Sequence, residues 1–112
     1  MPVLMEGVSE ETAGKAMQWL VDNAPKIAKA RAMRVFLEEG RKSLKARLQL
    51  TANAKSMAEA EAIAYAHSDY AGHLEALRDA VEADEELREL AAAARLKIEL
   101  WRTESANARS VR

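Results

Sequence analysis

The sequence predicts an all-α protein, a small helical bundle or helical hairpin that ends in a long C-terminal helix. The 112 residues are 49% hydrophobic but only 4% aromatic, with four Gly and two Pro. This composition is typical of helical bundles and differs from that of β sandwiches. Apolar residues also recur at steps of three and four, the period of an amphipathic helix. We expect a single domain, residues 1–112, whose small Ala- and Leu-rich core favours a homo-oligomer that adds buried area.

Two helices are expected in the N-terminal part, residues 9–50. Ser9 precedes two acidic residues and is predicted to be the N-cap of the first helix. That helix should end near Asn23, because Pro25 disfavours helical geometry in the residue before it. Pro25 then suits the first position of a second helix, which runs to Leu50. The apolar seam of the second helix comprises Ala30, Met33, Leu37, Gly40, Leu44 and Leu48.

Gly40 is the smallest residue of that seam. Glycine costs about 1 kcal/mol of helix propensity in such a position. Its missing side chain permits another element to approach closely, and a bend in the helix is the alternative.

A short helix is predicted between two breaks in the periodic pattern. Residues 51–56 form a polar connection, at the end of which Ser56 and Glu59 have the spacing of a capping box. We therefore expect a helix over residues 57–66. Residues 67–69 are the second break.

The final helix is predicted to be the longest. Ser68 is its expected N-cap, and the helix should run from Asp69 to about Glu104. Residues 107–112 are expected to be frayed.

The C-terminal segment 57–106 is predicted to serve packing and oligomerisation. The apolar residues of its long helix fall into two sets whose directions differ by roughly 100°. One helix with two apolar faces in series indicates two partners, one of them another subunit. The expected oligomerisation residues are Leu74, Leu77, Val81, Leu87, Ala91, Ala94, Ile98 and Trp101.

Charge is distributed unevenly along the chain, although the net charge is only −1. Residues 15–47 carry a net charge of +6, whereas residues 48–94 carry −7. Such asymmetry is expected of a chain with an anionic partner on one face. Neutralisation between segments or subunits is the alternative.

The basic segment places a group of cations beside the apolar seam of the second helix. At 100° per residue, five of them fall within a sector about 100° wide, whereas Arg47 flanks the seam on its other side. A row of cations along a helix can bind a nucleic-acid backbone without reading sequence. An ordinary solvated helix face is the alternative, since Glu38 and Glu39 interrupt the row. The five cations are Arg31, Arg34, Arg41, Lys42 and Lys45.

The sequence contains no motif that indicates catalysis or metal binding. It has no Cys, which excludes thiolate zinc sites and Cys nucleophiles. His67 and His73 do not share a helix face, and Tyr65, His67 and Tyr70 are interpreted as residues that pack around a turn. We expect a non-enzyme with no metal and no cofactor. An acidic cluster is interpreted as a solvated or protein-docking face: Glu82, Asp84, Glu85, Glu86 and Glu89.

Several stretches of the chain resemble the UvsY family of phage recombination mediator proteins. They are Trp19-Leu20, Arg34, and the block that runs from Gly40 to Leu48. Within that block, Leu-Lys-Ala-Arg-Leu is similar to a family segment that contributes to single-stranded DNA binding. The later run from Tyr70 to Arg109 is similar to the C-terminal helix through which family members associate into rings.

The resemblance implies a function. Family members bind single-stranded DNA, help displace or remodel the single-strand-binding protein, and load a RecA-type recombinase onto the strand. They are not enzymes. Lys45 and Arg47 carry over from the family as phosphate contacts, whereas the other four cations come from the charge distribution alone.

A structural or adaptor protein is the competing hypothesis. A helical oligomer for phage assembly or protein interaction, without DNA binding, would explain the long final helix and the absence of catalytic motifs equally well. In either case we expect a cytoplasmic protein without a membrane partner, because no apolar run approaches the ~20 residues of a membrane span. Residues 1–14 also lack the features of a signal peptide.

Overall fold

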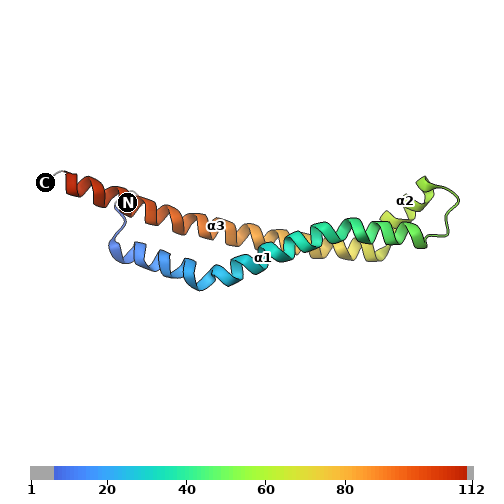
Figure 1. Cartoon of the computed structure of the whole chain (residues 1–112), viewed down its shortest axis with the longest axis horizontal. Coiled ribbons are helices and arrows are strands. Elements are labelled where there is room, and N and C mark those ends of the chain that lie inside the picture. The colour runs from blue at the N-terminus through green and yellow to red at the C-terminus, as the bar shows by residue number, and fades with distance from the viewer. Residues whose placement is uncertain (1–6, 111–112) are drawn as a thin grey trace, which may run out of the picture. The chain divides into compact units, whose positions relative to one another are not determined.

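The computed structural model describes residues 7–110 and contains three helices (Figure 1). They are α1 (Glu10–Thr51), α2 (Met57–Ala66) and α3 (Ser68–Ser110), and the described residues include no strand. The predicted all-α class is confirmed. None of these helices has a stretch apolar and long enough to span a bilayer.

Helix α1 is continuous, so the predicted end near Asn23 and restart at Pro25 were wrong. Pro25 lacks the N–H that would donate to the Val21 carbonyl. Both residues are exposed, and water can therefore satisfy that carbonyl. The Asn23 side-chain amide also donates to the Trp19 carbonyl at 2.8 Å, which adds a hydrogen bond in the turn before the proline.

The predicted caps of α1 and α2 are confirmed. The Ser9 hydroxyl accepts a hydrogen bond from the Thr12 N–H at 3.1 Å. The Ser56 hydroxyl accepts from the Glu59 N–H at 3.1 Å, and the Glu59 carboxylate accepts in turn from the Lys55 N–H at 3.1 Å. These local bonds explain why α2 has the predicted bounds.

The boundaries of α3 differ from the prediction at both ends. His67 alone separates α2 from α3, and its carbonyl accepts from the N–H groups of Tyr70 and Ala71. Its Nδ1 also accepts from the Asp69 N–H at 3.0 Å, so His67 occupies the capping position expected for Ser68. At the other end α3 continues to Ser110. Residues 107–110 of the segment expected to be frayed are thus helical, and 111–112 lie outside the described residues.

The chain divides into two compact units, each built from parts of α1 and α3. The central unit is Ala28–Glu85, which includes all of α2, and the terminal unit comprises residues 7–27 and 86–110. In the terminal unit the start of α1 and the end of α3 pack together, because the two helices are antiparallel.

Alanines form the core of the terminal unit. Its buried apolar residues are Ala13 and Ala16 of α1 with Ala91 and Ala94 of α3. Small side chains permit close approach of two helices, although each buries little apolar area. The Val8 N–H also donates to the Glu104 carboxylate at 2.9 Å.

Two of the predicted oligomerisation residues lie in this alanine core. Ala91 is 2% exposed and Ala94 is also buried, so neither offers surface to a second subunit. Of the other six, Leu74 is exposed and the remaining five are half-buried: Leu77, Val81, Leu87, Ile98 and Trp101.

Candidate nucleic-acid interface

The six predicted DNA-binding cations lie on α1 and divide into two groups. Arg34 and Lys45 are half-buried and form ion pairs with acidic side chains. The other four are exposed, and their side chains form no ion pair or hydrogen bond with any residue in 7–110. These four are Arg31, Arg41, Lys42 and Arg47.

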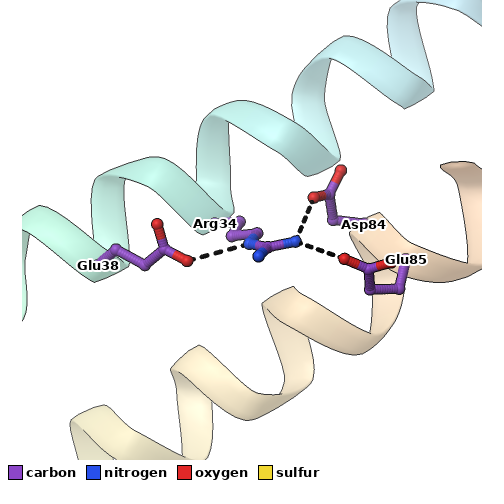
Figure 2. Close-up of polar contacts among 4 residues, drawn as sticks. All are labelled: Arg34, Glu38, Asp84 and Glu85. Atoms are coloured by element: carbon purple, nitrogen blue, oxygen red, sulfur yellow. Dashed lines mark hydrogen bonds and ion pairs between the residues drawn. The ribbon is translucent and has the colours of Figure 1, made fainter.

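Arg34 lies among three carboxylates in the central unit (Figure 2). Its Nε donates to Glu38 at 3.0 Å within α1. A terminal guanidinium nitrogen donates to Asp84 at 2.9 Å and to Glu85 at 2.8 Å, both on α3. Hydrogen bonds with Glu38, Glu85 and Asp84, in that order, raise the pKa of Arg34 further above its usual value. The guanidinium therefore connects the two helices and is not displayed on the exposed surface where we expected it.

The same contacts correct the interpretation of the acidic cluster. Asp84 is only 4% exposed and therefore does not belong to a solvated face, whereas Glu85 is half-buried and pairs with Arg34. The sequence contains a signal for this: Asp84 lies three residues after Val81 and three residues before Leu87, at helical spacing between two apolar residues. An acidic residue at a seam position requires a buried cationic or hydrogen-bonding partner.

Lys45 is held by residues of α2. Its Nζ donates to the Tyr65 hydroxyl at 2.6 Å and to the Glu61 carboxylate at 3.2 Å, and lies 4.4 Å from the Tyr65 ring centroid. These hydrogen bonds, the one to Tyr65 first, raise the pKa of Lys45 above its usual value. Lys45 therefore remains charged, but part of its hydrogen-bonding capacity is used within the chain.

A pocket of about 220 Å³ lies where the three helices meet in the central unit. Arg41, Lys42 and Lys45 of α1 line it together with Tyr65 of α2 and Tyr70 of α3. The two tyrosine rings make an edge-to-face contact, with centroids 5.3 Å apart and an interplanar angle of 81°. Tyr70 is buried and packs at the turn as predicted, whereas Tyr65 is 48% exposed.

The position of Tyr65 beside the cations was not predicted from the sequence, which indicated only a turn-packing residue. The signal was the spacing of the two tyrosines across a helix break, which brings the end of α2 and the start of α3 to the same end of α1.

Close packing at Gly40 holds α1 against α3 near this pocket. The His73 Nε2 donates to the Leu37 carbonyl at 2.7 Å. A Cβ on Gly40 would lie 3.3 Å from His73 Cε1. Gly40 therefore permits a close approach, the first of the two expected alternatives, and α1 continues through it without interruption.

Three of the exposed cations share one side of α1, which we call the basic face: Arg31, Arg41 and Lys42. By helical rotation they span a sector of about 100°. Arg31 and Arg41 are separated by about 15 Å along the helix axis, far enough apart to contact different phosphates. Arg47 points about 140° away from Lys42 and lies on the other side of the seam.

Comparisons with known proteins found no match among family models, curated proteins or solved structures. Within residues 7–110, no three His, Asp or Glu side chains are grouped as metal ligands would be.

Proposed function

We propose that the protein is a recombination mediator of the phage type. In this proposal it binds single-stranded DNA through the basic face and promotes loading of a RecA-type recombinase onto strands covered by single-strand-binding protein. It acts without catalysis or a cofactor, in the cytoplasm of the host. The observation that carries the DNA-binding part is the basic face itself, three exposed cations that form no ion pair with residues 7–110.

Exposed cations without internal partners are suited to bind phosphates. A cation that already has a carboxylate partner must lose that contact before it binds DNA, whereas an exposed one only exchanges water and counterions. Each phosphate neutralised releases condensed counterions, which favours binding at low salt. A homo-oligomer would repeat the face and raise avidity, although the net charge of one chain is only −1.

The role in recombinase loading is supported by the resemblance of the α1 segment around Lys45 and Arg47 to the UvsY family. The single-strand-binding protein and the recombinase are partners implied by that resemblance alone. A test is ATP hydrolysis by a RecA-type recombinase on DNA covered by single-strand-binding protein. The proposal predicts a shorter lag before hydrolysis when this protein is added. An unchanged lag at saturating protein would contradict the mediator role.

DNA binding is tested by fluorescence anisotropy with a labelled oligo-dT. The variant Arg31→Gln/Arg41→Gln/Lys42→Gln removes the basic face, and Arg95→Gln/Lys97→Gln/Arg109→Gln removes the same charge from the terminal unit. We expect wild-type binding that weakens with salt, a loss of at least about tenfold in the first variant, and a much smaller loss in the second. Absence of wild-type binding at low salt, or the reverse order of the two variants, would contradict the proposal.

A structural or adaptor oligomer remains the second candidate. The observation that favours it is the exposure of Leu96 and Leu100, one turn apart on α3, at 60% and 44%. This surface was not among the predicted oligomerisation residues. An oligomer that Leu96→Ser/Leu100→Ser dissociates, with no DNA binding by the wild type, would favour the structural function.

A further inference from the structure

The pocket of the central unit combines two kinds of group that recognise different parts of a nucleotide. Arg41 and Lys42 are exposed cations suited to a phosphate. Tyr65 offers an aromatic ring, and such rings stack on any base. Arg41 and Lys42 belong to the basic face, whereas Tyr65 comes from a different helix.

We propose that this pocket holds one nucleotide of single-stranded DNA, with its phosphate at Arg41 and Lys42 and its base against the ring of Tyr65. This inference rests on the proposed DNA binding and adds a base-contacting residue to it. The base contact is independent of sequence, because every base has a π face.

The ring of Tyr65 is held in place before a nucleotide arrives. Tyr70 contacts it edge to face, and the Lys45 Nζ donates to its hydroxyl at 2.6 Å. A side chain that is already ordered loses less entropy on binding. With about half of its surface exposed, Tyr65 retains ring surface for a base.

Charge within the pocket favours a nucleotide over an uncharged aromatic ligand. Three of its five lining residues are cations, and among the described residues only Lys45 of these three has a carboxylate partner, Glu61. Arg41 and Lys42 are available to one phosphate, and the ring of Tyr65 belongs to α2. The groups thus match a phosphate and a base joined by a sugar.

The test compares oligo-dT with an abasic oligonucleotide of equal length, which keeps the phosphates but has no bases. Tyr65→Leu removes the aromatic face, Tyr65→Phe keeps it without the hydroxyl, and Arg41→Gln removes a phosphate contact. We expect Tyr65→Leu to weaken oligo-dT binding by about 5- to 100-fold, the range for one base–aromatic contact, and to leave abasic binding unchanged. Tyr65→Phe should retain most oligo-dT binding, and Arg41→Gln should weaken both ligands equally.

The outcomes separate this inference from the proposed function. If the wild type binds neither oligonucleotide, DNA binding itself fails. If Tyr65→Leu weakens both ligands equally, or neither, the protein binds DNA but the pocket does not hold a base.

Photocrosslinking of the wild-type protein to an oligonucleotide that carries 5-iodouracil gives a result that needs no variant. A crosslink mapped to Tyr65 supports the inference. Efficient crosslinks that map only to other residues overturn it.

Discussion

The two units join the same pair of helices in different ways. In the terminal unit the buried residues are alanines, and close apposition of small side chains holds α1 to α3. The central unit also buries alanines, among them Ala64 and Ala80, but there Arg34 bridges to Asp84 and Glu85 and His73 donates to a backbone carbonyl. The cations of α1 in the central unit are not equivalent: Arg34 joins the two helices, whereas those of the basic face form no ion pair within residues 7–110.

Because of this difference, we expect the two units to respond to different kinds of substitution. Substitutions that change volume should act strongly in the terminal unit, whose buried apolar residues are all alanines. Substitutions that change charge should act on stability or on DNA binding in the central unit, according to whether the cation has a partner.

The largest effect is expected from a larger side chain in the alanine core. Ala91→Leu should lower the free energy of unfolding by about 1–3 kcal/mol, because Ala91 is 2% exposed and the helices must separate to admit the added atoms. Ala92→Leu, at an exposed neighbour, should change it by no more than about 0.5 kcal/mol. Urea unfolding measures both. Equal values for the two variants would show that the alanines do not form a packed core.

The next effect concerns the ion-pair cluster. Arg34→Met should lower the Tm by about 5 °C or more, because it removes the guanidinium 2.9 Å from a carboxylate that is 4% exposed. Arg31→Met, three residues away and exposed, should leave the Tm nearly unchanged. Thermal unfolding followed by circular dichroism compares them. Equal Tm values would remove the distinction between structural and exposed cations.

Alanine substitutions at two glycines should have smaller effects on the free energy of unfolding, with a gain expected at only one of them. A Cβ on Gly72 meets nothing within 4 Å, so Gly72→Ala should raise the free energy of unfolding by about 0.5–1 kcal/mol. Gly40→Ala should bring no such gain, because its Cβ would lie 3.3 Å from the ring of His73. Urea unfolding again decides. A full gain at Gly40 would mean that His73 moves away without cost.

The smallest effect should appear in DNA affinity. Glu61→Gln removes a negative charge 3.2 Å from the Lys45 Nζ and should strengthen oligo-dT binding about two- to threefold at low salt. Glu75→Gln, an exposed acid on α3, is the control with little expected change. Anisotropy titrations measure both. Weaker binding by Glu61→Gln would indicate that Glu61 positions Lys45 for DNA.

Local features of the fold were predictable from the sequence, and long-range ones were not. Ser9 and Ser56 bind N–H groups three residues away, and a pattern of neighbours is enough to find such caps. Pro25 remains inside α1, although its effect on the preceding residue predicted a break. The surroundings of Pro25 explain why the helix continues, since the Val21 carbonyl that loses its donor belongs to an exposed residue and can bind water.

For the candidate site, helical rotation placed five cations in one sector of α1 but could not show which of them would have partners. The partners of Arg34 on α3 are 50 and 51 residues away in the chain. The position of Tyr65 beside Lys45 depends similarly on how α2 returns along α1. Only the packed structure separates the cations of the basic face from those that stabilise the fold.

The central claim is that Arg41 and Lys42 bind phosphates and Arg34 does not. The salt dependence of oligo-dT binding tests it most directly, because each phosphate contact on a single strand contributes about 0.7 to the slope of log K against log salt concentration. We predict that the double variant Arg41→Gln/Lys42→Gln, which removes both contacts to one phosphate, lowers the slope by about that amount. Arg34→Gln, measured well below its Tm, should leave it unchanged. A lower slope for Arg34→Gln, with an unchanged slope for Arg41→Gln/Lys42→Gln, would contradict the account.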